Sequence, residues 1–165
     1  IDYFKARLDQ RLDFGRFSWV NNVQYQKVTQ EEIADQLLSG PLALNVPEWL
    51  IRSTLMLTSS IFNKALFFQS GATFTFFTDY YADQYNPLLA EFVTQNNTKI
   101  GEYPRVDFFF NAKIQSSRIY LKLENVSAPI EHLIKVDTPY DYYAAPFSPY
   151  RDFSIRFGLI WNFFQ

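Results

Sequence analysis

The C-terminal stretch Arg151–Gln165, RDFSIRFGLIWNFFQ, decides the fold that we expect. Its apolar side chains alternate with small or polar ones and end in aromatic residues, which is the period of two of a β-strand with unlike faces. In a bilayer every backbone N–H and C=O must be paired within the protein, so a spanning sheet turns one face to lipid and the other to a wet interior. The stretch therefore predicts the closing strand of an outer-membrane β-barrel. The alternating apolar positions are Phe153, Ile155, Phe157, Leu159, Trp161 and Phe163.

The composition supports a membrane class through its aromatic residues. The 165 residues are 48% hydrophobic, which would also suit a soluble domain, but 19% are aromatic, with 18 Phe and 11 Tyr. A lipid-facing belt with interfacial girdles uses aromatics in this number. Because no run approaches the roughly 20 apolar residues of a spanning helix, we expect spanning strands. A net charge of -2 gives no basic footprint for nucleic acid, and the absence of cysteine excludes disulfides and thiolate metal sites.

Further segments upstream repeat the same alternation and bring the predicted total to about seven strands. The turns at Gly15, Asn63 and Ser116 are short, whereas three connections are long. Bacterial barrels have short periplasmic turns and long extracellular loops, and usually end with a strand that runs down into the periplasm, so all three long connections are expected outside. The upstream alternating segments are residues 3–14, 17–28, 49–58, 66–76, 105–114 and 118–125.

Charges separate between the predicted strands and the predicted loops. Nine cations alternate onto the inward face and are the candidate pore-lining residues: Lys5, Arg7, Arg11, Arg52, Arg105, Lys113, Arg118, Lys122 and Arg156. Four acids share this face: Asp9, Asp13, Asp107 and Glu124. Most other acids fall in the outer loops: Glu31, Glu32, Asp35, Asp79, Asp83, Glu91, Glu102, Glu131, Asp137 and Asp141. A basic wall would favour anions or polar solutes. Alternatively, these residues keep a lumen hydrated and form salt bridges.

Two groups of segments carry a resemblance to a known family. AKIQSSRIYLKLENVSAPI (112–130) and YDYYAAPFSPYRDFSIRFGLIWNFFQ (140–165) resemble the closing strands of the putative porin family of Bacteroidota, especially flavobacteria. Three earlier stretches resemble the preceding strands and loops of that family: NVPEWLIRSTLMLTSSIFNKALFFQSGATFTFF (45–77), YNPLLAEFVTQNN (85–97) and PRVDFFFNAKI (104–114). The resemblance implies an outer-membrane β-barrel of a Gram-negative bacterium. We therefore expect the barrel to act as a porin that gives passive passage to small hydrophilic solutes.

The expected partners follow from that class. They are outer-membrane lipid, the barrel assembly machinery and other outer-membrane subunits, with no nucleic acid, no cofactor, no metal and no enzymatic activity. The assembly machinery is expected to engage the last strand through its aromatic and apolar row. That candidate assembly signal comprises Phe157, Leu159, Trp161, Phe163 and Phe164.

Seven strands are not expected to close a barrel by themselves. Bacterial single-chain barrels have even numbers of strands, and an open sheet of seven would leave two unpaired edges in lipid. We therefore expect residues 1–165 to be the C-terminal section of a larger barrel, without a second domain, whose other strands lie upstream or in other chains. A non-conducting subunit of a multiprotein outer-membrane complex is the alternative. Five bulky inward residues motivate it, since they need a plug, a partner or local bulges: Phe67, Phe77, Phe109, Tyr120 and Ile160.

Other single features favour no chemistry. His132 has no second histidine and no nucleophile at a recognisable spacing, so we expect no catalysis there. The acidic pairs Glu31–Glu32 and Asp137–Asp141 are either loop ligands for a divalent cation or ordinary solvated charges. A loop cluster of Tyr140, Tyr142, Tyr143, Phe147 and Tyr150 is either a sugar-stacking surface or an interfacial girdle. A soluble carbohydrate-binding β-sandwich would alternate too, but it does not need apolar residues on the outward face of every strand.

Overall fold

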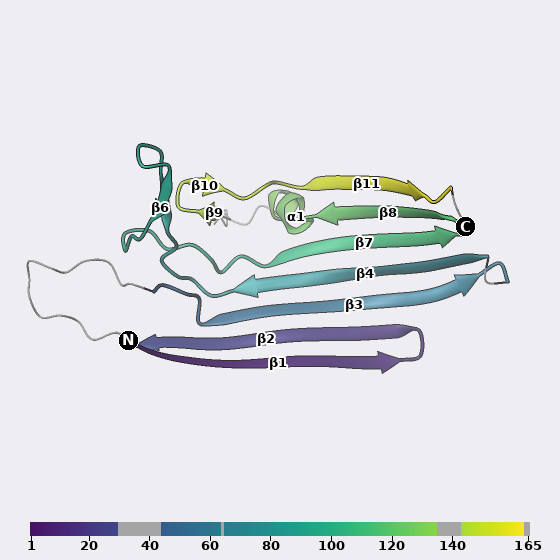
Figure 1. Cartoon of the computed structure of the whole chain (residues 1–165), viewed down its shortest axis with the longest axis horizontal. Helices are drawn as coiled ribbons and strands as arrows, with labels where there is room; N and C mark the ends of the chain where they lie inside the picture. The colour runs from purple at the N-terminus through teal and green to yellow at the C-terminus, as the bar shows by residue number, and fades with distance from the viewer. Residues whose placement is uncertain (30–43, 64, 135–142, 164–165) are drawn as a thin grey trace, which may run out of the picture.

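The computed structural model describes residues 1–29, 44–63, 65–134 and 143–163, without the side chains of 131–134. Its main feature is one antiparallel sheet of seven strands in the order β1-β2-β3-β4-β7-β8-β11 (Figure 1). The predicted all-β fold and strand number are confirmed. The sheet is open, because β1 and β11 each pair with a single neighbour. The strands are β1 (Asp2–Phe14), β2 (Phe17–Thr29), β3 (Trp49–Ile61), β4 (Leu66–Phe77), β7 (Arg105–Ile114), β8 (Ser117–Glu124) and β11 (Ser154–Trp161).

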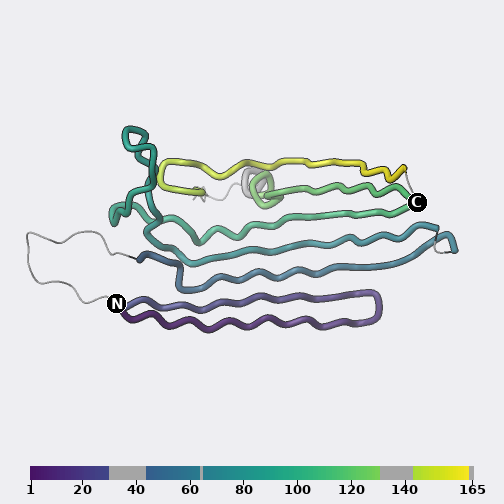
Figure 2. Tube along the Cα trace, in the orientation of Figure 1, coloured from purple at the N-terminus to yellow at the C-terminus, as the bar shows by residue number. Residues whose placement is uncertain are grey.

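Short turns join the strands at one end of the sheet and long connections at the other (Figure 1). Phe14 pairs with Phe17 across a two-residue turn in which Gly15 has a φ of 62°, a left-handed conformation that glycine adopts without a steric penalty. The other two short turns carry Asn63 and Gln115, also at positive φ. Figure 2 follows the resulting up-and-down path, which leaves the sheet between β4 and β7 and between β8 and β11. The predicted separation of short turns and long connections to opposite ends of the sheet is therefore confirmed.

The long connections contain structure where the sequence predicted only loops. One holds the hairpin of β5 (Gln84–Asn86) and β6 (Glu91–Val93). The other holds helix α1 (Ser127–Ile134) and the hairpin of β9 (Tyr143–Ala145) and β10 (Ser148–Pro149). The strands of these hairpins have two or three residues each, and α1 has eight, about two helical turns, so neither the 2- nor the 3.6-residue period can repeat enough to stand out. The final strand is also shorter than predicted, because β11 begins at Ser154 instead of Arg151.

The described residues form a single layer with almost no interior. Their buried hydrophobic residues are Ala82, Ile100, Tyr103 and Ala112. The chain exposes 12413 Å², whereas a compact monomer of this mass exposes about 8,500 Å². A β-sandwich would bury one face of each sheet against the other, so the sandwich alternative does not describe this structure. Among the described residues, no helix has the length and apolar character needed to cross a membrane.

Candidate functional site

The pairing register sorts the strand side chains onto two unlike faces. We call them the apolar face and the polar face. On the apolar face Leu8 pairs with Val23, which pairs with Ile51, which pairs with Phe76. At the other edge Phe157 pairs with Leu121 and Leu159 with Ile119. Aromatic rings add contacts along this face, with centroids 4.8 Å apart for Tyr25 and Trp49 and 6.2 Å apart for Phe68 and Phe110. Most of these side chains have no second layer over them.

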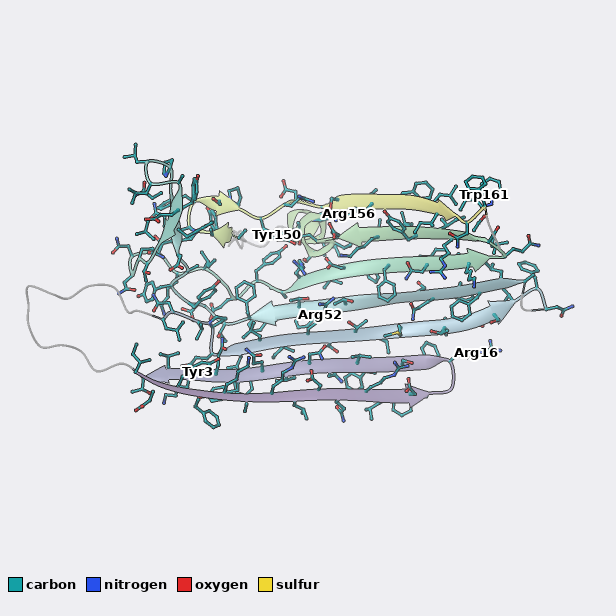
Figure 3. All side chains as sticks on the ribbon, viewed as in Figure 1. Tyr3, Arg16, Arg52, Tyr150, Arg156 and Trp161 are labelled. Atoms are coloured by element: carbon teal, nitrogen blue, oxygen red, sulfur yellow. The ribbon has the colours of Figure 1, made fainter. Side chains whose placement is uncertain are left out.

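All nine predicted pore-lining cations lie on the polar face. The register shows this directly where they pair across strands: Lys122 lies opposite Arg156, Lys113 opposite Arg118, and Arg52 opposite Asn22. Figure 3 shows Arg52 on β3 and Arg156 on β11, in different halves of the sheet. The structure brings the nine residues to one surface; that this surface lines a pore stays a prediction.

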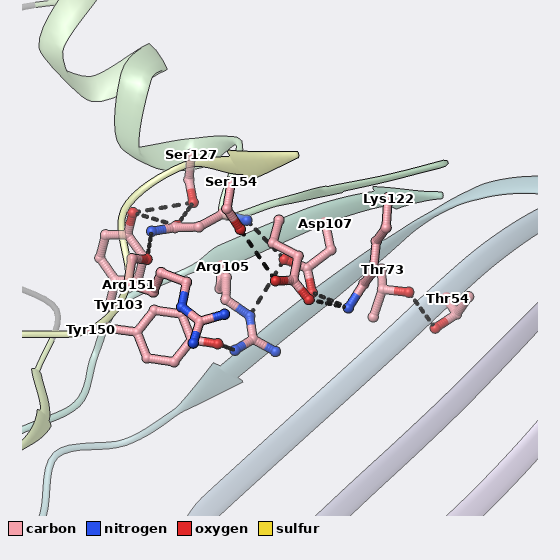
Figure 4. Close-up of polar contacts among 12 residues, drawn as sticks. Thr54, Thr73, Tyr103, Arg105, Asp107, Lys122, Ser127, Tyr150, Arg151 and Ser154 are labelled. Atoms are coloured by element: carbon pink, nitrogen blue, oxygen red, sulfur yellow. Dashed lines mark hydrogen bonds and ion pairs between the residues drawn. The ribbon is translucent and has the colours of Figure 1, made fainter. Parts of the chain in front are cut away.

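Two buried or half-buried acids bind the cations of β7, β8 and β11 into a network. Figure 4 shows the part of it around Asp107, with Arg105 and Lys122. Glu124 Oε1 lies 2.7 Å from Lys122 Nζ, and Glu124 Oε2 lies 2.8 Å from Arg156 Nε. Asp107 is 5% exposed and lies 3.6 Å from Arg105 Nε and 3.9 Å from Lys122 Nζ. Its Oδ1 also accepts the backbone N–H of Asn125 at 2.9 Å. In this part of the polar face, two acids therefore balance two of the three cations.

Asn125 directs the chain away from the sheet where β8 ends. It has a φ of 55°, which asparagine tolerates better than most residues, and Val126 N donates to Val106 O, one residue out of step with the β7–β8 register. The Tyr103 hydroxyl contacts Asn125 Oδ1 at 3.0 Å and Ser127 Oγ at 3.2 Å. Asn125 Nδ2 donates to Arg151 O at 3.2 Å. Helix α1 thus starts from a buried polar cluster beside Asp107.

Tyr150 belongs to the buried polar cluster around Asn125 and Asp107, a role that the sequence did not reveal. Arg105 Nη1 donates to the Tyr150 hydroxyl at 2.7 Å, and the guanidinium carbon of Arg105 lies 5.3 Å from the ring centroid. Of the aromatic loop cluster that the sequence predicted, Tyr150 contacts the polar face, while Phe147 is 73% exposed. Tyr140 and Tyr142 lie outside the described residues. No strand periodicity extends into this connection, so a loop tyrosine could not be placed from the pattern.

The polar face is more open on β1 to β4. Arg7 pairs with Asp9 at 2.8 Å and Arg11 with Asp13 at 3.0 Å, and all four side chains are more than half exposed. Such exposed pairs contribute little to stability, because water screens the charges. Four of the nine cations form no ion pair with any residue that the structure describes: Lys5, Arg52, Lys113 and Arg118. The predicted salt bridges therefore form for five of the nine cations.

Two of the bulky residues predicted to point inward pack onto glycines of the neighbouring strand. Phe109 lies opposite Gly71, and a Cβ built there would come within 2.8 Å of Phe109 Cζ. Tyr120 lies opposite Gly158, whose added Cβ would overlap the tyrosine ring. The main-sheet register is continuous throughout, so bulges do not explain these residues. Phe67 and Ile160 remain exposed at the turn end, and the ring of Phe77 meets the ring of Tyr80 edge to face, with centroids 6.0 Å apart.

The remaining predicted features gather no site in the described residues. Lys99 Nζ donates to Asp79 at 2.8 Å in the connection between β4 and β7, and this bond raises the pKa of the lysine. Burial, and then the charge of Asp83, raise the pKa of Tyr80. His132 lies in α1, but its side chain lies outside the description, as do Glu31, Glu32, Asp137 and Asp141. The part of the chain described contains no group of three His, Cys, Asp or Glu residues placed to hold a metal.

The predicted assembly signal lies on the β11 edge. Phe157, Leu159 and Trp161 share the apolar face and are each more than half exposed. Phe163 follows the strand and stacks on Trp161 with centroids 5.2 Å apart, while Phe164 lies outside the described residues. Because β11 has a partner on one side alone, its other side presents unpaired backbone groups next to this apolar row.

The fold is a single-layer antiparallel meander with one apolar and one charged face. It places the chain in the class of amphipathic β-sheet proteins, in which the two faces of a sheet suit different surroundings. Comparison with known families identifies the family within this class. The family described as "Putative porin" matches residues 1–165, the whole chain, so the chain belongs to that family. Nothing among the curated proteins or the solved structures matches it.

Proposed function

We propose that this chain forms part of the wall of an outer-membrane porin that gives passive passage to small hydrophilic solutes. In this proposal the apolar face meets lipid and the polar face lines a water-filled lumen. The observation that carries it is a single layer that exposes apolar rows on one face and nine cations with four acids on the other. A soluble protein would have to cover the apolar rows, whereas lipid covers them without further structure. Membership of the porin family supports the same conclusion.

The dimensions of the longer strands suit a membrane. Each of β1, β2 and β3 has 13 residues, which corresponds to about 43 Å at roughly 3.3 Å per residue. A spanning β-strand needs about 9–11 residues at a tilt near 45°. The extra length would carry these strands past the hydrocarbon region into the interfaces. We place the short turns in the periplasm and the long connections outside the cell.

The open sheet requires further strands. In lipid the free edges of β1 and β11 would leave backbone groups without partners, so we propose that additional strands close the barrel. They come from the same polypeptide, making this the C-terminal section of a larger barrel in a Gram-negative bacterium of the Bacteroidota, or from other chains. The proposed partners are outer-membrane lipid and the barrel assembly machinery, which would engage β11.

The central test is conductance. The native outer-membrane protein that carries this chain, purified in detergent and placed in planar bilayers, is expected to give stepwise, ohmic current in potassium chloride. A mock preparation from a strain lacking the gene is the control. Extraction of the protein without detergent would contradict its membrane position. A stable, detergent-extracted protein that stays silent would contradict the porin and favour a non-conducting subunit of an outer-membrane complex.

The mass of the native polypeptide tests how the barrel closes. The intact mass of the detergent-purified polypeptide is expected to be well above 19.5 kDa, because one polypeptide is expected to supply the missing strands. A mass near 19.5 kDa would instead mean that the sheet closes with other chains. Co-purification of those chains in fixed ratio would then identify them.

A further inference from the structure

We propose that the polar face carries a binding site for small organic carboxylates, centred on Arg52. The proposal rests on the lumen-facing position given above and names a class of solute for that lumen. Its starting point is that Arg52 is exposed and forms no ion pair or hydrogen bond with the described residues. A guanidinium presents a planar fork of donors that matches the two oxygens of a carboxylate.

A groove of about 230 Å³ surrounds this arginine. It lies between two neighbouring cross-strand rows of the polar face, as the register shows. One row begins with Arg7 and Gln24, and the other contains Asn22, Arg52 and Thr75. Pockets for drug-sized ligands measure about 300–1,000 Å³, so this groove suits a smaller molecule.

A second unsatisfied polar group borders the groove. Thr75 Oγ1 is buried and lacks a hydrogen-bond partner in the part of the chain described. The register places Thr75 directly between Arg52 on β3 and Arg105 on β7. Neighbouring strands are about 4.8 Å apart, so the two arginine backbones lie about 10 Å apart with the hydroxyl between them. Arg52 and Thr75 are therefore neighbours in one row, and each can donate a hydrogen bond to an oxyanion in the groove, whereas Arg105 is held by Asp107 and Tyr150.

The apolar lining decides which anions fit best. Leu50 and Phe77 contribute to the groove beside Arg52. A strongly hydrated inorganic ion would gain nothing from these side chains, whereas a carboxylate with an apolar body could place its head on Arg52 and its body on the carbon surface. Weak and reversible binding of this kind is compatible with passage, because a solute must also leave the site.

The test compares benzoate binding by four forms of the intact, detergent-purified protein. Isothermal titration calorimetry is expected to show saturable binding to the wild type and a loss of affinity of about tenfold or more in Arg52→Gln. Arg118→Gln is the matched control, because Arg118 is also an exposed polar-face cation that forms no ion pair with described residues, but lies at the turn end of β8. This control is expected to bind benzoate like the wild type. Arg52→Lys keeps the charge without the fork and is expected to bind with intermediate affinity.

Two further ligands and a substitution at a second position of the groove, Thr75, complete the test. Acetate is expected to bind more weakly than benzoate, and benzyl alcohol not measurably, because each lacks one half of the recognised chemistry. Thr75→Val removes the unpartnered hydroxyl and is expected to weaken benzoate binding while leaving the thermal unfolding midpoint unchanged or higher. Circular dichroism checks that each variant keeps its sheet. No binding to the wild type, or equal losses in Arg52→Gln and Arg118→Gln, would overturn the site.

The outcome is separable from that of the porin proposal. Benzoate binding lost in Arg52→Gln, in a protein that conducts no ions, would leave the site standing and remove the porin. Ohmic conductance without benzoate binding would do the reverse.

Discussion

Replacing Gly71 with alanine is expected to lower the free energy of unfolding by about 3 kcal/mol, near the upper end of the range for overpacking. A Cβ on Gly71 would overlap the Leu55 carbonyl oxygen and come within 3.0 Å of Met56 Cα. Both atoms belong to the backbone of β3, so no side-chain rotation relieves the overlap. The strands β3 and β4 would have to separate, and the Phe109 ring would also have to shift from its place over the glycine. Urea unfolding of the purified protein in detergent, followed by tryptophan fluorescence, measures the loss.

Gly158 provides the matched control. It also lies on the polar face beneath an aromatic ring, but the three nearest atoms to its added Cβ all belong to the Tyr120 side chain. Rotation about χ1 of this tyrosine can clear the space, so Gly158→Ala is expected to cost clearly less than Gly71→Ala. An equal or larger loss for Gly158→Ala would show that the β3 backbone does not set the penalty at Gly71.

The strands and their two faces could be predicted from the sequence because each strand is long and repeats its period without interruption. A one-residue slip would move every side chain to the other face, so an alternation maintained over segments such as 3–14 and 105–114 fixes the facing residues. This is why the register brings all nine predicted cations together. The turns at Gly15 and Ser116 were predictable for a related reason, because only two or three residues lie between the alternating segments there.

The long connections were not predictable because their contacts depend on tertiary structure. Asn125 follows a strand like many loop residues, and nothing in the pattern shows that its side chain meets Tyr103 and Ser127. An asparagine directly after a strand is a signal for a positive φ, but not for a buried cluster. Tyr150 could be assigned to a girdle or to a ligand site, whereas the structure shows it on Arg105.

The candidate site was predictable only in part. The sequence places Arg52 on the charged face, yet it cannot show which cations find acidic partners, since pairing depends on distances between strands and along them. Glu124 pairs with both Lys122 and Arg156, so these two cations are not free to bind an anion. No described carboxylate lies within ion-pair distance of Arg52. The groove beside Arg52 likewise depends on side-chain size in two adjacent rows, a property of the folded sheet.

Asp107→Ala is expected to lower the free energy of unfolding by about 3 kcal/mol, because it breaks a buried charge network on one side. The substitution leaves Arg105 and Lys122 without one acidic partner and removes the acceptor of the Asn125 N–H. Since Asn125 fixes the start of the connection that carries α1, loosening of this connection is expected as well. Trypsin should then cleave after Arg151, whose carbonyl accepts a hydrogen bond from Asn125, faster than in the wild type. Urea unfolding and timed proteolysis in detergent measure the two effects.

Two further variants separate charge from position. Asp9→Ala removes an acid from the same face, but Asp9 is half exposed and its partner Arg7 is more exposed still, so the expected loss of stability is clearly smaller than that of Asp107→Ala. Asp107→Asn keeps an oxygen for the Asn125 N–H while it removes the charge, and is expected to lie between the two alanine variants. If Asp107→Ala proved no more costly than Asp9→Ala, the cluster at the end of β8 would not hold the connection in place. Unchanged cleavage after Arg151 in an otherwise destabilised Asp107→Ala protein would instead locate the effect of the carboxylate within the strands β7 and β8, because the ion pairs with Arg105 and Lys122 lie there.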